Sequence, residues 1–527
     1  MLEVLKTWMT GPWAGKTMLA LRVSFFVFFS LSALLLLLPG RDTIRRGAIG
    51  RPQRLLAIIA ALGFVAIAAF QSRWQVFGAS NPDLMRFVRR HNVRPDVDVR
   101  RGSILDRNGS VLAIDGEGGV RRQPLMAAAA HVVGYIDPMA GLAGLEKAAD
   151  DILTGSGTTP LEDLKRLGRG ILSLPPVEGT DIRVTIDARL QRFAFNALDG
   201  RRGAVVALDA DTGEILALVS SPSFNPLRPL DASSSHSSSA PLLNRALQGR
   251  YPPGSTFKVA MALMAADLGI APVLNCPAEG YRAEGESRPI RDSEYYSYAR
   301  EGRTWRGFGK IGLSEALIHS SNVYFAQLSR RIPAEHFNTY IDRLGVNEAH
   351  ALYGSGKSAV VAPAGSVPVL DATNAKSIIQ LAIGQGRMLV TPLDVALWTA
   401  VAANGGEFVA PTLDLASPGQ ARRRVVSHQA ASNVSYMMRA AVKSGTGRAA
   451  DIPLLGVCGK TGTAQNPGGE DHSWFTCFAS QAKPRLVVTV LVENGGYGSK
   501  GAAPVARKIL EEAARLQIIK AEGGAAK

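Results

Sequence analysis

One serine and one lysine in this chain have a spacing suited to nucleophilic catalysis. They begin and end residues 255–258 (Ser-Thr-Phe-Lys), which open a predicted helix directly after Pro253 and Gly254. Side chains at positions i and i+3 share one helix face, so the Lys258 amine can reach the Ser255 hydroxyl. The helix amino terminus adds unpaired N–H groups and a positive dipole end, which favour negative charge developing on the serine oxygen. We therefore predict that Ser255 is a nucleophile and that Lys258 is its base.

The Ser-x-x-Lys pattern is weak by itself, because it recurs by chance about once in a chain of this length. Residues 480–483 (Ser-Gln-Ala-Lys) repeat it, but Pro484 follows between two strand-like runs, which indicates a surface turn. The assignment of Ser255 consequently depends on partner motifs elsewhere in the chain.

A second polar group, Ser320-Ser321-Asn322, lies within residues 313–328. Apolar residues at helical spacing predict one helix over that whole range. Taken alone, such a group is more often an ordinary helix-terminal or solvent-facing cluster, and residues 223–225 (Ser-Phe-Asn) repeat it in a predicted loop.

A third group, residues 460–463 (Lys-Thr-Gly-Thr), follows an apolar run and is predicted to lie on one strand of a hairpin. Threonine favours strands, and Gly462 removes a side chain where a ligand or another backbone could approach closely. The similar residues 443–447 (Lys-Ser-Gly-Thr-Gly) close a helical stretch and are interpreted as a helix terminus.

The elements around these motifs predict an α+β domain. Strands come first, helices follow, and strands return near the end, an order typical of a mainly antiparallel sheet flanked by helices. The expected elements are a strand at 182–186, a helix at 188–198 capped by Asp187, a hairpin of 204–208 and 215–219, strands from residue 454 and a helix at 503–516. Before them, Asp106-Arg107-Asn108-Gly109 is typical of a hairpin turn.

Two apolar runs, residues 19–38 and 55–70, open the chain. Their lengths predict transmembrane helices at about residues 18–38 and 55–75, within a membrane anchor over residues 1–78. The loop between them carries five arginines and one acid, so the positive-inside rule places it in the cytoplasm and the later residues outside. A buried or re-entrant second segment, or cleavage after Ala66-Ile67-Ala68, are the alternatives.

The amino-acid composition limits the classes of ligand and partner that we expect. The net charge is +15, from 59 Lys and Arg against 44 Asp and Glu, but the basic residues are scattered and no nucleic-acid-binding motif occurs, so we predict no nucleic-acid partner. Eight histidines and three cysteines show no metal-ligand spacing, so no metal and no cofactor is expected. A disulfide between Cys458 and Cys477 across a hairpin is a minor alternative.

Together, and in this order, the three motifs resemble the active-site set of penicillin-binding proteins and serine β-lactamases. Residues 101–109 and 144–147 resemble the pedestal module of class B penicillin-binding proteins, which implies a pedestal over 79–178 and a penicillin-binding transpeptidase domain over 179–520. A short pedestal and two membrane spans depart from that class and leave the subgroup open. Further matches in the second domain are residues 243–247 (Leu-Asn-Arg-Ala-Leu), 384–386 (Gly-Gln-Gly), 390–393 (Val-Thr-Pro-Leu) and 472–475 (His-Ser-Trp-Phe).

The resemblance implies a peptidoglycan D,D-transpeptidase of the bacterial inner membrane, with its catalytic domain on the extracytoplasmic side. Its substrates would be D-Ala-D-Ala stem peptides, β-lactams would inhibit it, and a glycan polymerase of the SEDS family would accompany it in the membrane. The implied roles are acylation at Ser255, base catalysis by Lys258, proton relay by Ser320, peptide holding by Asn322, and carboxylate and oxyanion binding by Lys460, Thr461, Gly462 and Thr463.

Rival functions share the same motifs. Hydrolysis of the acyl-enzyme would make the protein a D,D-carboxypeptidase or a β-lactamase, although no Glu-x-x-x-Asn segment of the class A β-lactamase type is present. A non-enzymatic sensor of β-lactams or peptidoglycan is the remaining alternative. A role in elongation, division or sporulation and the acceptor amine are left open.

Overall fold

The computed structural model describes residues 99–116, 120–155, 177–234, 239–283, 288–371, 373–417, 421–466, 468–479 and 485–520. All of these residues belong to one compact unit, Arg89–Lys527. The two apolar runs predicted to cross a membrane lie outside the described residues. Within the described ranges, no helix is both long and apolar enough to cross a bilayer.

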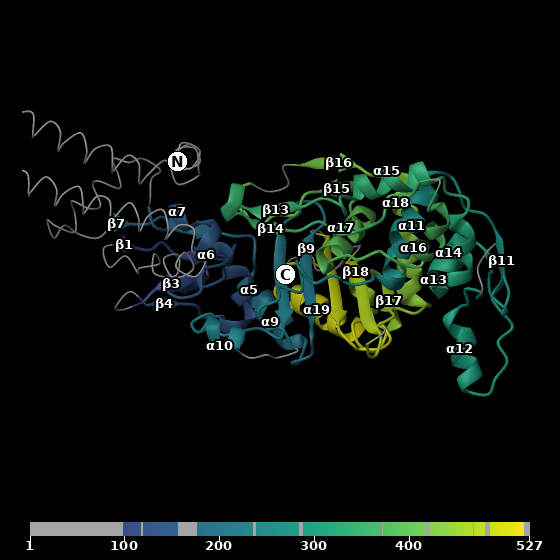
Figure 1. Ribbon diagram of the computed structural model, residues 1–527, viewed down its shortest axis with the longest axis horizontal. Helices are drawn as coiled ribbons and strands as arrows, with labels where there is room; N and C mark the ends of the chain where they lie inside the picture. Colours follow the sequence, from purple (N-terminus) through teal and green to yellow (C-terminus); the bar gives the residue numbers. More distant parts are fainter. Residues whose placement is uncertain are drawn as a thin grey trace, which may run out of the picture. The chain divides into compact units, whose positions relative to one another are not determined.

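A five-stranded antiparallel sheet in the order β10-β9-β19-β18-β17 runs through the larger part of this unit (Figure 1). Its strands are almost wholly buried, because helices cover both faces, and this explains their near-continuous apolar sequences. The predicted α+β fold with a mainly antiparallel sheet is confirmed. The strands are β9 (Gly203–Asp209), β10 (Ile215–Ser221), β17 (Val457–Ala464), β18 (His472–Ala479) and β19 (Leu486–Val492).

Alternate side chains of the sheet enter two hydrophobic cores. On β9, Val205 and Ala207 face one core, whereas Val206 and Leu208 face the other. Helices α9 (Ala188–Ala197) and α19 (Ala503–Arg515) pack on the first face. The second face is covered by α11 (Lys258–Asp267), α17 (Pro392–Ala403) and α18 (His428–Lys443).

The pairing of β17 with β18 shows whether Cys458 and Cys477 can form a disulfide. Gly459 pairs with Cys477, and Cys458 pairs with Phe478, so the two thiols are one position out of register. Adjacent residues of a strand point to opposite faces. Cys458 accordingly enters one core and Cys477 the other, which rules out a disulfide between them.

Local signals define the helix that precedes the sheet. The carboxylate of Asp187 accepts hydrogen bonds from the backbone N–H groups of Arg189 and Leu190 at 3.0 and 3.2 Å. An Asp at the N-cap satisfies N–H groups that the helix itself leaves unpaired. The predicted cap is confirmed, and α9 ends at Ala197, one residue before the predicted end.

The amino-terminal part of the unit contains a four-stranded sheet in the order β4-β3-β2-β8. The predicted turn at residues 106–109 joins β2 to β3, with Gly109 at φ +84° and Asp106 accepting from the N–H of Ser110 at 2.7 Å. Strand β8, expected to begin the next domain, instead pairs in parallel with β2. The domain boundaries stay a prediction. The strands are β2 (Ile104–Leu105), β3 (Val111–Asp115), β4 (Arg121–Arg122) and β8 (Ile182–Arg183).

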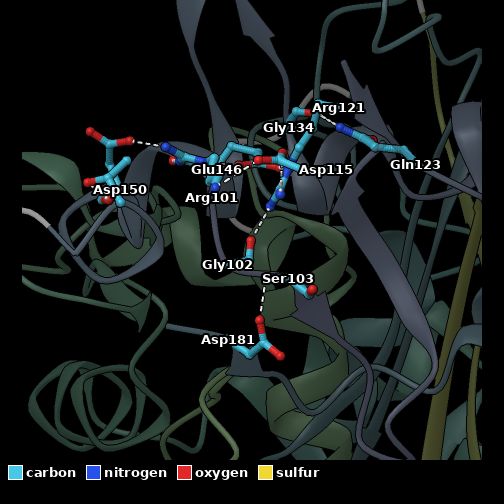
Figure 2. Close-up of polar contacts among 11 residues, drawn as sticks. Arg101, Gly102, Ser103, Asp115, Arg121, Gln123, Gly134, Glu146, Asp150 and Asp181 are labelled. Atoms are coloured by element: carbon cyan, nitrogen blue, oxygen red, sulfur yellow. Dashed lines mark hydrogen bonds and ion pairs between the residues drawn. The ribbon is translucent and has the colours of Figure 1, made fainter. Parts of the chain in front are cut away.

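Figure 2 shows a cluster of ion pairs that connects the two pedestal-like motifs. The wholly buried Glu146 accepts from Arg101 Nε at 2.9 Å and from Arg121 Nε at 2.7 Å. Arg121 also pairs with Asp115 at 3.0 Å, and Arg101 with Asp150. Each buried charge of this cluster therefore has an oppositely charged partner, as burial requires. These ion pairs join residues 101–109 and 144–147 into one structure.

The remaining elements are short. The helices are α5 (Ala130–Val133), α6 (Gly144–Ala148), α7 (Asp150–Leu153), α10 (Pro229–Ser234), α12 (Ser293–Arg300), α13 (Leu313–His319), α14 (Asn322–Ser329), α15 (Ala334–Leu344) and α16 (Ile378–Ala382). The strands are β1 (Val99–Arg100), β5 (Ile136–Asp137), β6 (Gly141–Leu142), β7 (Val177–Glu178), β11 (Leu274–Cys276), β12 (Gly309–Ile311), β13 (His350–Tyr353), β14 (Val360–Ala362), β15 (Glu407–Val409) and β16 (Arg422–Arg424).

Candidate active site

Ser255 lies in a tight 3-10 turn, η3 (Gly254–Phe257), that leads directly into α11. Gly254 has φ +54°, and a Cβ there would lie 2.5 Å from the carbonyl oxygen of Thr463, so glycine alone lets the turn approach β17. Ser255 is partly exposed, and its hydroxyl makes no hydrogen bond within the described ranges. The oxygen is thus accessible to a ligand.

Two further sequence matches, residues 384–386 and 472–475, contribute hydrogen bonds that hold the backbone of this turn. The N–H of Gly254 donates to the carbonyl of Gly384 at 2.9 Å, and a Cβ on Gly384 would lie 1.9 Å from the Gly254 carbonyl oxygen. On the other side, the indole N–H of Trp474 donates to the carbonyl of Pro252 at 3.1 Å. Residues far apart in the sequence therefore fix the backbone that carries Ser255.

Lys258 begins α11 and is wholly buried. Its Nζ donates to the carbonyl of Ser320 at 2.6 Å and to Oδ1 of Asn322 at 2.6 Å, and it lies 3.4 Å from the Ser320 hydroxyl. The amine is thus held by the second motif, and the expected hydrogen bond to the Ser255 hydroxyl is not formed in this structure. Catalytic hydrogen bonds are often long in ligand-free sites and tighten on binding.

The second motif interrupts a helix. The prediction of one helix over 313–328 is wrong, because α13 ends at His319 and α14 begins at Asn322. Between them Ser320 adopts the left-handed conformation (φ 60°, ψ 37°), and Ser321 caps α14 by accepting from the N–H of Tyr324 at 3.1 Å. Serine can bond its neighbouring backbone and so compete with the helix, while apolar spacing continues across the break. The interruption aims both Ser320 and Asn322 at Lys258.

Asp292 is a site residue that sequence reasoning missed. It is 2% exposed and accepts from the Ser321 hydroxyl at 3.2 Å and from the N–H of Val323 at 3.1 Å. The adjacent carbonyl of Arg291 accepts from the Asn322 amide at 3.0 Å. No sequence signal separated it from an ordinary aspartate before a helix, since only the fold brings it beneath the second motif.

The third motif lies on β17, an edge strand of the sheet. Nζ of the wholly buried Lys460 donates to the Ser320 hydroxyl at 2.8 Å and to the carbonyl of Thr461 at 3.0 Å. A Cβ on Gly462 would meet Cγ2 of Thr256 at 2.7 Å, so this glycine lets the nucleophile turn pack against the strand. The Ser320 hydroxyl therefore lies between the two lysine amines.

Two threonines make further hydrogen bonds at the third motif. Thr463 is the last residue of that motif, and Thr446 lies outside β17 but contacts it. The Thr463 hydroxyl accepts from the N–H of Gly498 at 3.5 Å, and the hydroxyls of Thr446 and Thr461 are 2.7 Å apart. Thr446 belongs to residues 443–447, whose interpretation as a helix terminus is confirmed by the end of α18 at Lys443. That interpretation missed its contact with the third motif, which a local pattern could not reveal.

Burial dominates the electrostatics of the two lysines. It lowers the pKa of Lys258 to about 7, against the opposing pull of Asp292 and Glu294. Burial, together with repulsion from Lys258, lowers the pKa of Lys460 well below its usual range. Burial also raises the pKa of Asp292 and of Glu294. The site can therefore hold a neutral, basic amine near neutral pH. Among the described residues, no group of three or more His, Cys, Asp or Glu could hold a metal ion.

This electrostatic arrangement makes a prediction for Asp292→Asn. Removing the negative charge takes away a contribution that raises the pKa of Lys258, so neutral Lys258 persists to lower pH. We expect the acylation rate with a β-lactam to begin its rise at a lower pH than in the parent. This difference applies at pH values where Asp292 of the parent protein is ionised. Stopped-flow acylation on both sides of pH 7 measures this rise.

The matched control is Asp267→Asn, at the far end of α11, where the carboxylate accepts from the Tyr340 hydroxyl at 2.6 Å. This variant should leave the rise in place. A rise that stays put or moves to higher pH in Asp292→Asn would contradict the charge argument.

Comparison with known proteins identifies the family. The model of the penicillin-binding protein transpeptidase domain matches residues 203–511, more than half of the chain. The chain belongs to this family. The match begins at the first strand of the central sheet and ends within α19, so it takes in the whole of the sheet and the site described above.

Curated relatives of this penicillin-binding protein carry related names. It is 32% identical to peptidoglycan D,D-transpeptidase MrdA of Acinetobacter baumannii over 72% of its own length and 64% of that protein's. It is 31% identical to peptidoglycan D,D-transpeptidase PbpA of Mycobacterium tuberculosis, covering 73% of its own length and 82% of the relative's. The chain thus spans less than two thirds of the MrdA protein.

Solved structures share the fold. Penicillin-binding protein 2 of Pseudomonas aeruginosa is 30% identical, with a TM-score of 0.66 and coverage of 82% of this chain and 98% of that one. The ceftriaxone acyl-enzyme complex of penicillin-binding protein A from M. tuberculosis is 28% identical, also with a TM-score of 0.66, and covers 79% of this chain and 98% of the other.

Proposed function

We propose that this penicillin-binding protein is a peptidoglycan D,D-transpeptidase that forms an acyl-enzyme at Ser255. The observation that carries the proposal is the meeting of Lys258, Ser320, Asn322 and Lys460 in one hydrogen-bonded group beside an accessible serine. The names of the MrdA and PbpA relatives support it, and so does the β-lactam acyl-enzyme formed by the M. tuberculosis protein.

In the proposed acylation, Oγ of Ser255 attacks the carbonyl carbon between the two D-alanines, and its proton passes to neutral Lys258. The negative charge on the carbonyl oxygen is stabilised by N–H groups of Ser255 and Thr463. The first turn of a helix leaves its N–H groups unpaired, and an edge strand such as β17 does the same along its outer side. The C–N bond then breaks, and the proton reaches the leaving D-alanine amine through the Ser320 hydroxyl.

Lys460 suits the terminal carboxylate of the stem peptide. A carboxylate beside its amine favours the ammonium form, and that charge in turn disfavours a proton on Lys258 by repulsion. The hydroxyls of Thr461 and Thr463 offer further donors to the same carboxylate. Substrate binding would thus favour the protonation states that acylation needs.

An amine of a neighbouring stem peptide then attacks the ester, releases Ser255 and completes the cross-link. Attack by water instead would give a D,D-carboxypeptidase, or a β-lactamase if the acyl group came from penicillin. We also propose that residues 1–78 anchor the chain in the inner membrane beside a SEDS-family polymerase, with the catalytic domain outside. The two apolar runs and the arginine-rich loop between them support this placement.

The proposal is tested with the full-length protein in detergent. Fluorescent penicillin should label it covalently on the peptide that contains Ser255, and mass spectrometry should show a donor pentapeptide losing D-alanine as it joins an acceptor amine. A folded protein that takes up no label would refute acylation. Hydrolysed peptide alone would identify a carboxypeptidase, rapid release of hydrolysed penicillin a β-lactamase, and labelling without peptide turnover a sensor.

A further inference from the structure

A buried carboxylate lies behind the nucleophile turn and is not part of the three motifs. Glu493 follows β19 directly, and its side chain is 8% exposed. Its Oε1 accepts from the Tyr251 hydroxyl at 2.7 Å and from Nε of Arg245 at 2.7 Å, and its Oε2 pairs with Arg202 at 2.8 Å. Arg245 is itself 1% exposed and Arg202 is 42% exposed, so a buried Glu493–Arg245 ion pair with one exposed arginine at its edge lies beside the site.

On physical grounds, stability alone does not account for a buried ion pair at this position. Removing two or more charges from water costs several kcal/mol for each ion, and well-packed apolar residues of similar volume are often as stable or more so. Buried polar networks instead specify a particular geometry. The geometry that this one specifies is the position of Tyr251 relative to the sheet.

Tyr251 lies four residues before Ser255 in the same loop. Its backbone pairs with Val390 through two hydrogen bonds of 2.9 Å, and its ring packs edge-on against His472 and Trp474 of β18. Its hydroxyl connects this loop to Glu493 at the end of β19. The Tyr251 hydroxyl therefore adds a polar side-chain link between the nucleophile loop and the sheet to the one that the Trp474 indole makes with the Pro252 carbonyl.

The same sheet carries the other half of the site. Trp474 on β18 pairs with Gly462 on β17, the glycine against which the nucleophile turn packs. A shift of the loop relative to β18 and β19 would consequently change the separation between Ser255 and the edge strand. Acylation needs reacting groups held to within about half an ångström, so small shifts of this kind are costly.

We propose that Glu493 is a positioning residue, which holds Ser255 in register with β17 through the Tyr251 hydroxyl. The inference rests on the proposed acylation of Ser255. Glu493 touches no substrate in this scheme, and its effect falls on the rate of acylation and not on the binding of the β-lactam.

The test uses Tyr251→Phe in the full-length protein. Alanine at Glu493 would leave the buried guanidinium of Arg245 without its carboxylate and would cost stability, whereas phenylalanine at position 251 removes one hydroxyl and keeps the ring for both of its contacts. Because the lost hydrogen bond is to a charged carboxylate and fixes the loop, we expect the acylation rate constant for fluorescent penicillin to fall about tenfold. The dissociation constant of the preceding non-covalent complex should not change.

Tyr340→Phe is the matched control. The Tyr340 hydroxyl donates to Asp267 at 2.6 Å, and Tyr340 is 3% exposed against 7% for Tyr251, so both variants lose a buried tyrosine–carboxylate bond. Asp267 lies at the opposite end of α11 from Lys258, roughly 14 Å along the helix. The control should lose similar thermal stability and keep the parent acylation rate. Glu493→Gln, which keeps an acceptor oxygen, should acylate faster than Glu493→Ala.

Three results would overturn the inference: equal acylation rates in the two tyrosine variants, a change confined to the dissociation constant, or Glu493→Gln no faster than a folded Glu493→Ala. A parent protein that takes up no label would instead refute the proposed function, so the two failures are distinguishable.

Discussion

Replacing Ser255 with alanine is expected to abolish covalent labelling by penicillin, a fall in the acylation rate of at least about 10⁴-fold. The reason is chemical, since the oxygen that forms the ester is gone. The hydroxyl makes no hydrogen bond to the described part of the chain, so its removal should leave thermal stability close to that of the parent. Gel fluorescence after denaturation and a thermal melt measure the two quantities.

Ser432→Ala provides the control for this prediction, because Ser432 is an exposed serine on α18. That variant should label like the parent. Labelling that persists at full strength in a folded Ser255→Ala protein would exclude Ser255 as the nucleophile, whatever the geometry around it.

Removing the base is expected to have the next largest effect. Lys258→Ala and Lys258→Arg should each lower the acylation rate by about 10² to 10⁴-fold, the usual contribution of a positioned general base. Arginine retains the positive charge and stays protonated, so it cannot accept the serine proton. In the parent, burial lowers the pKa of Lys258 to about 7, so the acylation rate should rise as the pH increases through that value.

A structural contribution of Lys258 must be separated from a catalytic one. Its amine holds the Ser320 carbonyl and the Asn322 side chain, so both variants also disturb the second motif. A small primary amine added to Lys258→Ala should restore part of the acylation rate if a base is what is missing. Parent-like acylation by Lys258→Arg, with its rise through neutral pH intact, would contradict the assignment of Lys258 as the base.

Much of the fold could be predicted because its signals are local. The Asp187 cap acts on N–H groups two and three residues away, and the turn at residues 106–109 places a glycine where φ is positive. The apolar runs of β9 and β10 are adjacent in sequence and form the predicted hairpin. In such cases the interacting groups are close neighbours, so their order in the chain is sufficient information.

The predictions that failed depended on contacts between distant residues. The helix over 313–328 breaks at Ser320 because Asp292 and Lys258 hold the polar groups exposed at the break, and neither partner is nearby in sequence. The disulfide between Cys458 and Cys477 was only a minor alternative, and the strand pairing of Gly459 with Cys477 excludes it because the two thiols point to opposite faces of the sheet.

By itself, the sequence determined which residues could do chemistry: a serine and a lysine one helical turn apart, and two further polar motifs in a fixed order. Only the tertiary structure decided what those residues face. It buried both lysines around one serine hydroxyl, which lowers their pKa values, and it brought Thr446 to Thr461 and Glu493 to Tyr251. Burial and long-range contact arise from packing of the whole chain, so no local pattern could contain them.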